Sequence, residues 1–119
     1  MEIPKIFESE YRFCLILWDN EPVNSTKLVE LCKVQLGWSK ATTYTVIRRL
    51  SERGVVKNEN ATVTALISKE EAQKHRLEEM VEETFEGSMP AFIAAFSKSK
   101  RLTRSEVEQL QALIDNFQE

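Results

Sequence analysis

The feature that most constrains the fold of this chain is a change of apolar period at Gly54. Before Gly54, apolar side chains recur at the spacing of α-helices. After it come two β-branched runs, "VVKN" and "TVTALI", separated by "ENA". Short runs of this kind around a turn are the pattern of a two-stranded hairpin. The sequence therefore predicts helices followed by a hairpin, and helical signals return from Ser68 onward.

Two helices are predicted before residue 38. The first spans Glu10 to Trp18 behind Ser9 as N-cap, and "DNEPVNS" ends it with turn residues. Its expected core face is Tyr11, Cys14, Leu15 and Trp18. The second helix begins behind Asn24 or Ser25 and ends at Gly37. Its expected buried residues are Leu28, Val29, Leu31, Cys32 and Leu36.

A third helix is predicted from Lys40 to Arg53, with Ser39 as N-cap and Gly54 as its end. At about 100° per residue, the core side comprises Tyr44, Val46, Ile47 and Leu50, with Thr43 half-buried. The opposite side carries Thr42, Thr45 and Arg49, with Arg48 and Glu52 at its edge. Three helices followed by a hairpin are the outline of a winged helix-turn-helix.

The C-terminal part is predicted to form helices at about 69–86, 90–98 and 104–117. Ser68 with Glu71, and Thr103 with Glu106, form capping boxes. About fifty residues with three apolar faces have little internal core in which to bury them, so we expect a homodimer. The residues expected to bury its interface are Leu77, Met80, Val81, Phe85, Phe92, Phe96, Leu110, Leu113, Ile114 and Phe117. We therefore predict a mainly α chain with a winged-helix DNA-binding domain at 1–67 and a helical dimerisation module at 68–119.

The charge distribution suits a nucleic-acid partner although the net charge is −3. Residues 1–67 carry 9 Lys or Arg against 8 Asp or Glu, whereas residues 68–119 carry 7 against 11. The basic side chains between residues 40 and 57 are Lys40, Arg48, Arg49, Arg53 and Lys57, against Glu52 alone. Because salt screens charges beyond about 10 Å, this local patch matters more to a phosphate than the total does.

The polar side of the third helix has the chemistry of a DNA-reading surface. Threonine offers a hydroxyl and a methyl group to base edges, and arginine reaches guanine or clamps a phosphate. Ser39, Lys40 and the first N–H groups of the helix suit a phosphate. An ordinary solvated face is the alternative interpretation, and the position of the helix before a hairpin favours the DNA-reading one.

Four stretches together resemble a known family. They are "LWDNEPVNSTKLVE", "WSKATTYTVIRRLSERGVV", "ISKEEAQ" and "TFEGSMPAFIAAF". They are similar to the penicillinase and methicillin-resistance repressor family, whose relatives include copper-responsive repressors. The resemblance covers nearly the whole chain. It implies a dimeric winged-helix repressor of a palindromic operator in double-stranded DNA, dimerised through its C-terminal helices, with Thr42, Thr45 and Arg49 on the DNA-facing side.

The chain departs from the family pattern at the DNA-facing positions. Ala41 and Tyr44 stand where some members carry basic residues, so we expect a different operator sequence. The hairpin tip lacks the basic and aromatic residues of relatives. Lys57 is then the main phosphate contact there, with Asn58 and Asn60 as neutral donors. Fewer phosphate contacts predict a shallower salt dependence.

Regulation is the least constrained property. In antibiotic-resistance members of the family, induction involves proteolysis in the C-terminal module. The aligned bond here is Ala95–Phe96, and the family's asparagine before this phenylalanine is absent, so we expect Phe96 to anchor the dimer core instead. Copper-type members use C-terminal cysteines, and none follows Cys32. The sequence identifies no upstream sensor, protease or inducer.

Other classes of protein are disfavoured. No nucleophile–histidine set, phosphate loop or metal cluster occurs, so we expect neither an enzyme nor a bound cofactor or metal. Cys14 and Cys32 are predicted to be reduced and buried, and His75 to be a solvated helix residue. No apolar run approaches the ~20 residues of a membrane span, and the N-terminus does not resemble a signal peptide. We therefore expect a cytoplasmic protein without a membrane partner. A winged-helix module that binds another protein rather than DNA stays the alternative.

Overall fold

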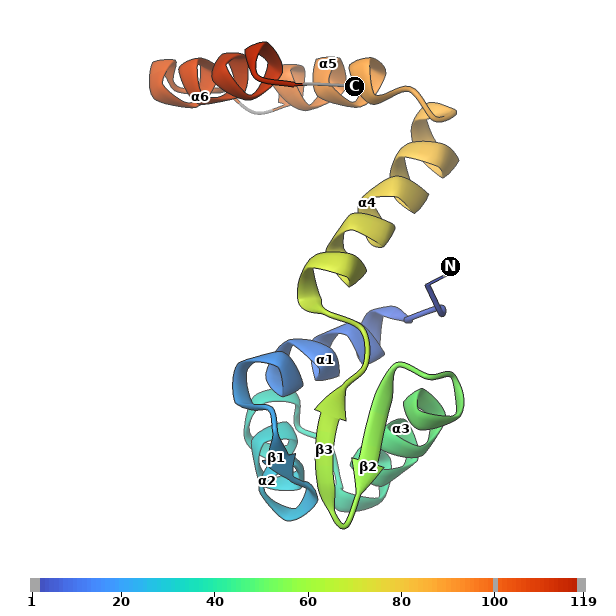
Figure 1. Cartoon of the computed structure of the whole chain (residues 1–119). Coiled ribbons are helices and arrows are strands. Elements are labelled where there is room, and N and C mark those ends of the chain that lie inside the picture. The colour runs from blue at the N-terminus through green and yellow to red at the C-terminus, as the bar shows by residue number, and fades with distance from the viewer. Residues whose placement is uncertain (1–2, 100, 118–119) are drawn as a thin grey trace. The chain divides into compact units, whose positions relative to one another are not determined.

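A computed structural model describes residues 3–99 and 101–117 of the chain (Figure 1). Over these residues the helices are α1 (Glu8–Asn20), α2 (Ser25–Leu36), α3 (Lys40–Glu52), α4 (Lys69–Phe85), α5 (Met89–Ser99) and α6 (Arg104–Asp115). The strands are β1 (Val23–Asn24), β2 (Val56–Glu59) and β3 (Thr62–Ala65). The chain divides into two compact units, Met1–Arg76 and Leu77–Glu119, so that the boundary falls inside α4.

The first unit is a winged helix, as predicted. Helices α1, α2 and α3 pack on a sheet with strand order β1-β3-β2, antiparallel throughout (Figure 1). The sequence predicted β2 and β3 but not β1, which lies in the segment interpreted as a turn. Val23 pairs with Val63, about forty residues later. A two-residue strand has no period of its own, so only this distant partner defines it.

The core of the first unit draws on every element around it. Its largest fully buried side chains include Phe13 and Leu17 from α1, Leu28 from α2, Leu50 from α3 and Val63 from β3. Fully burying a side chain of this size stabilises the fold by roughly 2 kcal/mol. Of the α2 residues predicted to be buried, Leu28 and Cys32 are fully buried, and Val29, Leu31 and Leu36 are half-buried.

Helix α1 differs from its prediction in the direction of its core face. Cys14 is buried as expected, but Tyr11, Leu15 and Trp18 are only half-buried. The core side chains between them, Phe13, Ile16 and Leu17, were not predicted. The physical reason is that α1 is covered on two sides. Phe13 stacks on Trp38, whereas Tyr11 contacts α4 and Trp18 contacts the segment that leads into it.

The caps of α1 and of the next two helices explain where each begins. The predicted N-cap Ser9 lies inside α1 instead, because the Glu10 carboxylate accepts the backbone N–H of Phe7 at 2.9 Å and extends the helix backwards. The other predicted caps are confirmed. Asn24 accepts the N–H of Thr26 at 2.8 Å, and Ser39 accepts that of Thr42 at 3.1 Å. Gly37 ends α2 with a φ of +71°.

The hairpin formed by β2 and β3 is the wing of the first unit. Asn60 and Ala61 connect its strands with φ values of +52° and +63°. Positive φ at both central residues is the turn geometry that matches the twist of a two-residue hairpin. The carbonyl of Ala61 accepts the backbone N–H of Ser25 at 2.7 Å. The tip of the wing is thereby joined to the first residue of α2.

The second unit comprises the end of α4 together with α5 and α6. Both predicted capping boxes form: Ser68 with Glu71 before α4, and Thr103 with Glu106 before α6. The Phe92 ring contacts those of Phe85 and Phe96, at centroid distances of 5.7 and 6.3 Å. The helices otherwise touch one another little in the described part of the chain.

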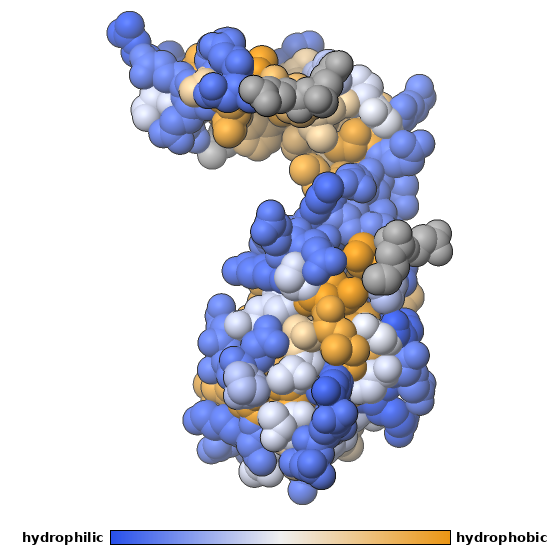
Figure 2. Space-filling view, viewed as in Figure 1, coloured by the Kyte–Doolittle hydropathy of each residue, from blue (hydrophilic) through white to orange (hydrophobic). Residues whose placement is uncertain are grey.

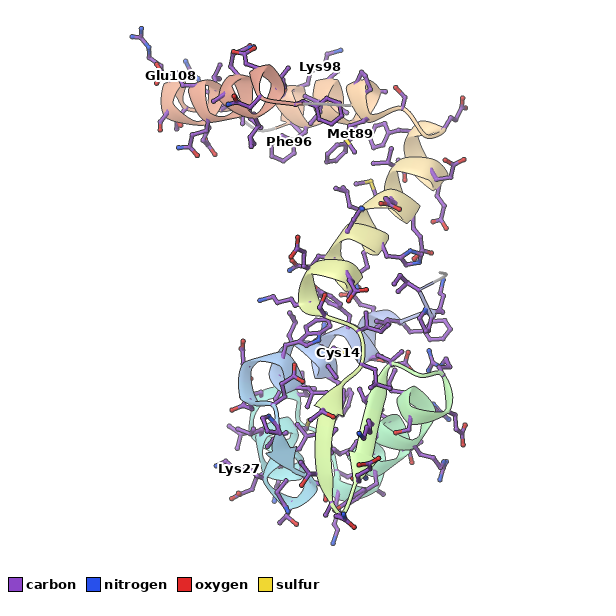
Figure 3. The ribbon with its side chains drawn as sticks, viewed as in Figure 1. Cys14, Lys27, Met89, Phe96, Lys98 and Glu108 are labelled. Carbon is purple, nitrogen blue, oxygen red and sulfur yellow. The ribbon has the colours of Figure 1, made fainter. Side chains whose placement is uncertain are left out.

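Apolar side chains of the second unit are largely exposed. Within the described residues, neither α5 nor α6 contains a buried residue. Leu113, Ile114 and Phe117 are 70%, 67% and 73% exposed. Figure 2 shows apolar surface on this part of the chain, and in Figure 3 Met89 and Phe96 lie on one side of α5 with Lys98 on the other. No helix of the described residues is both long and apolar enough to span a membrane.

Candidate nucleic-acid interface

The orientation of α3 follows from the residues it buries. Thr43, Val46, Ile47 and Leu50 face the core. Thr43 is 0% exposed rather than half-buried as predicted, since its hydroxyl donates to the Ser39 carbonyl at 3.1 Å and needs no water. Because Thr43 is buried, the centre of the buried side of α3 lies closer to Thr43 than predicted. The centre of the exposed side is shifted around the helix axis by the same angle.

At about 100° per residue, the direction opposite this core is occupied by Ala41, Thr45, Arg48 and Glu52. Arg48 therefore lies near the centre of the outward face, where the sequence pattern had placed it at the edge. Thr42 and Arg49 are exposed on one flank of that face, and Thr45 is half-buried. Lys40 is exposed at the first turn. We call these six residues, without Glu52, the α3 face.

The hydroxyl groups at the start of α3 are already ordered. Ser39 Oγ accepts the N–H of Thr42 and donates its own proton to Thr42 Oγ1 at 3.0 Å. The Thr42 hydroxyl accepts this bond and keeps its proton as a donor. Donors at the positive end of a helix are suited to a phosphate oxygen. Ser39 thus orients the hydroxyl of Thr42.

Arg53 is not part of the DNA-facing patch, although the charge pattern counted it there. Its guanidinium donates to the Glu10 carboxylate with both terminal nitrogens, and also to the Lys5 carbonyl at 2.7 Å. Glu10 is only 5% exposed, and a buried carboxylate requires a charged partner. Nothing in the local pattern around residue 53 signals a partner on a distant helix.

The wing carries little net positive charge. The Nζ atom of Lys57 lies 3.3 Å from a carboxylate oxygen of Glu59 on the same strand. Asn58 and Asn60 are exposed, and Asn60 lies in the turn. Glu59 therefore competes with a phosphate for the ammonium group of Lys57. The two side chains lie two residues apart on one strand face, but the prediction from the sequence did not include this pair.

A further polar contact joins α3 to α2. The Tyr44 hydroxyl donates to Ser25 Oγ at 3.3 Å, and Ser25 is buried. Ser25 also donates its N–H to the wing, so one residue connects the reading helix, α2 and the hairpin tip. Lys27, exposed in the first turn of α2, reaches into solvent (Figure 3). The sequence pattern alone predicts no role for Ser25 or Lys27 and does not predict this contact of Tyr44.

The two cysteines are free and buried, as predicted. Burial raises the pKa of Cys14 to about 12, assisted by the charge of Glu10, and raises the pKa of Cys32 to about 11. Both are therefore thiols rather than reactive thiolates at neutral pH. His75 is half-buried on α4 rather than fully solvated, because the first part of α4 packs on α1. Among the described residues, no group of His, Cys, Asp and Glu side chains is arranged to hold a metal ion.

Comparison with known proteins agrees with this architecture. The profile of the penicillinase repressor family matches residues 6–116. The methicillin resistance regulatory protein MecI of Staphylococcus aureus is 21% identical over 115 residues, which cover 93% of this chain and 94% of that protein. The protein of the same name from Mammaliicoccus sciuri is 20% identical over equal shares. A 16.5 kDa protein in the ptsI 3' region of Latilactobacillus sakei is 27% identical, over 92% of this chain and 78% of its own.

The family match begins before α1 and ends after α6, so it includes both compact units. The winged-helix fold of the first unit is in keeping with the DNA-binding role that the match implies. This chain belongs to the penicillinase repressor family and is a transcriptional repressor.

Proposed function

We propose that the chain represses transcription as a homodimer bound to a palindromic operator in duplex DNA. Each protomer places α3 in the major groove, and the two helices occupy half-sites about one DNA turn, roughly 10 bp, apart. The bound dimer then excludes RNA polymerase from the promoter. The observation that carries the proposal is the α3 face: Arg48 is exposed opposite a fully buried helix side, and Lys40, Thr42 and Arg49 are exposed beside it.

The residues of the α3 face have separate tasks in this proposal. Arg48, near the centre, is best directed toward a base edge, where guanine accepts two hydrogen bonds from one guanidinium. The methyl groups of Ala41 and Thr45 lie beside it and suit the methyl group of thymine. Lys40, Thr42 and Arg49 flank this centre and suit phosphates, which fix the register of the protein on the duplex.

The dimer in this proposal uses the apolar side chains of the second unit. Leu77, Phe96, Leu113, Ile114 and Phe117 are each at least 39% exposed, and Val81 is buried within the protomer. A soluble monomer rarely exposes so many large apolar side chains close together. Packing against a second copy removes them from water, and joining two half-site contacts raises operator affinity through effective concentration. Of the module predicted at 68–119, residues 68–76 belong to the first unit, where Gln73 and Arg76 contact α1, so the proposed interface lies from Leu77 onward.

A gel-shift titration on a palindromic duplex from the protein's own promoter tests the proposal. The wild-type protein is expected to bind the palindrome well above a scrambled duplex. Arg48→Ala is expected to weaken binding by roughly 1–3 kcal/mol per half-site, the worth of a bidentate arginine–base contact. Arg49→Ala is expected to weaken specific and scrambled duplexes alike, since phosphate contacts carry no sequence information.

The matched control is Arg104→Ala, which makes the same charge change at an exposed position of α6. It should leave DNA affinity unchanged while the protein stays dimeric. Equal binding of palindrome and scrambled duplex by the wild type would contradict operator recognition. That result would favour the alternative, a winged-helix module that binds a protein.

A further inference from the structure

The first half of α4 is held against α1 by a cluster of side chains from both helices. Arg76 Nη2 donates to Glu8 Oε2 at 2.8 Å, and its guanidinium lies over the Tyr11 ring at 3.9 Å from the centroid. Gln73 Nε2 donates to the Tyr11 hydroxyl at 3.3 Å. We call Glu8, Tyr11, Gln73 and Arg76 the α1–α4 clasp. The clasp thus consists of an ion pair between Arg76 and Glu8, together with a cation–π contact and a hydrogen bond that both involve Tyr11.

Contacts on the N-terminal side of the clasp reinforce it. The indole N–H of Trp18 donates to the Ile67 carbonyl at 3.0 Å, just before α4 begins. Trp18 and Tyr11 meet edge to face at 5.8 Å, so the two aromatic rings form one surface along α1. Ala72, in the first turn of α4, is 1% exposed. The segment from Ile67 to Arg76 is therefore fixed to α1 by backbone, apolar and charged contacts together.

The position of Arg76 gives the clasp its significance. It is the last residue of the first compact unit, and α4 continues without a break to Phe85 in the second. The clasp therefore holds the first half of α4 against α1 up to the boundary between the two units. Arg76 is the clasp residue nearest to that point.

We propose that the α1–α4 clasp positions the two reading helices for operator binding, by fixing the direction in which α4 leaves the winged unit. The inference rests on the proposed function, because only a dimer on two half-sites has a spacing to fix. Glu8 is 65% exposed and Arg76 36%, and an exposed ion pair contributes little to stability. Breaking the clasp should therefore loosen the selection of half-site spacing without unfolding the protein.

The test compares Arg76→Gln with Arg12→Gln. Both variants remove one positive charge beside Glu8, since Arg12 Nε lies 4.0 Å from the same carboxylate, but Arg12 belongs to α1 and does not join it to α4. Fluorescence anisotropy measures the affinity of each dimer for three duplexes. These are the native palindrome, the palindrome with one base pair inserted at its centre, and a single half-site.

The wild type and Arg12→Gln are expected to prefer the native palindrome over the lengthened one by roughly tenfold or more, because one extra base pair rotates the second half-site by about 35°. Arg76→Gln is expected to lose most of this preference while keeping wild-type affinity for the half-site. Glu8→Gln, which breaks the same pair from α1, should reproduce Arg76→Gln.

Retention of the wild-type spacing preference by Arg76→Gln and Glu8→Gln would overturn the inference. So would an equal loss of affinity for all three duplexes, which would show that the clasp only supports the fold of the winged unit. Failure of the wild type to bind any palindrome would instead overturn the proposed function.

Discussion

Glu10 connects the start of α1 to the end of α3. Its carboxylate is buried at the start of α1 and binds Arg53, the C-cap residue of α3. Burial on its own would raise the pKa of Glu10, but hydrogen bonds from Arg53 and from the Phe7 N–H outweigh it and hold this pKa below 4.5. The carboxylate is thus ionised in the folded state, and its ion pair with Arg53 holds the C-terminal end of α3 against the start of α1.

Replacing Glu10 by Gln tests this pair through its pH dependence. At pH 7 the Glu10→Gln protein is expected to be less stable by roughly 2 kcal/mol, the loss of charged hydrogen bonds that are largely buried. Because the folded pKa is lowered, the stabilisation is complete above the unfolded value near 4.5 and disappears as the pH falls through the folded value. The difference from wild type should therefore shrink in strong acid.

Urea titrations at pH 7 and at about pH 3, which is below the usual carboxyl pKa range, measure this difference. Glu30→Gln, at an exposed position of α2, provides the matched control and should change stability little at either pH. An equal cost of Glu10→Gln at both pH values would show that the carboxylate charge contributes nothing to holding α3.

At the scale of elements, the wing differs from α3 in its charge. The cations of the α3 face are exposed, whereas Lys57 on β2 lies against Glu59. In the proposed complex the Glu59 carboxylate would also face the DNA backbone and repel it. In that complex, α3 would contribute most of the phosphate attraction and the wing little.

Removing the internal partner of Lys57 should change this balance. Glu59→Gln is expected to tighten DNA binding at low salt and to steepen the plot of log K against log salt by about 0.9 per protomer, the release from one additional phosphate. Affinities measured over a series of salt concentrations give the slope. The double variant Lys57→Ala with Glu59→Gln should lose the steeper slope. If it keeps that slope, the added affinity comes from reduced repulsion and not from Lys57.

At the scale of the whole molecule, exposed apolar side chains separate the second unit from the first. Phe13, Leu17, Leu28 and Leu50 are fully buried in the first unit, whereas α5 and α6 contain no buried residue in the described part of the chain. The first unit has a core of its own, whereas in the described part of the second unit Val81 alone is buried. In the proposed function, association with a second copy buries these exposed apolar side chains. Operator binding then depends on protein concentration.

Ile114→Asp tests this dependence, because a charge at a buried apolar interface is strongly unfavourable. Sedimentation should show a monomer, and affinity for the palindrome is expected to fall by roughly a hundredfold or more as effective concentration is lost. Half-site affinity and thermal unfolding of the winged unit should stay at wild-type values. Gln109→Asp, on an exposed polar position of the same helix, should remain dimeric. A dimeric Ile114→Asp protein would exclude this surface as the interface.

What the sequence revealed in advance was mainly local. The caps at Asn24, Ser39 and Thr103 depend on residues within three positions of one another, and the strands of the hairpin after Gly54 pair residues at most nine positions apart; all are confirmed. The contacts that the sequence did not predict are long-range: β1 on β3, Arg53 on Glu10 and Tyr44 on Ser25. Local periodicity carries no information about partners that only the tertiary fold brings together, so the composition of the basic patch was predicted incorrectly at Arg53.

The backbone bond from Ser25 to Ala61 has a consequence for the energetics of recognition. A hairpin tip that moves freely must lose conformational entropy when it meets a ligand, and that loss subtracts from affinity. Here the tip is immobilised during folding, before any duplex arrives. In the proposed complex, a neutral donor such as Asn60 would then lose little conformational entropy on binding, and this saving would partly offset the shortage of positive charge at the tip.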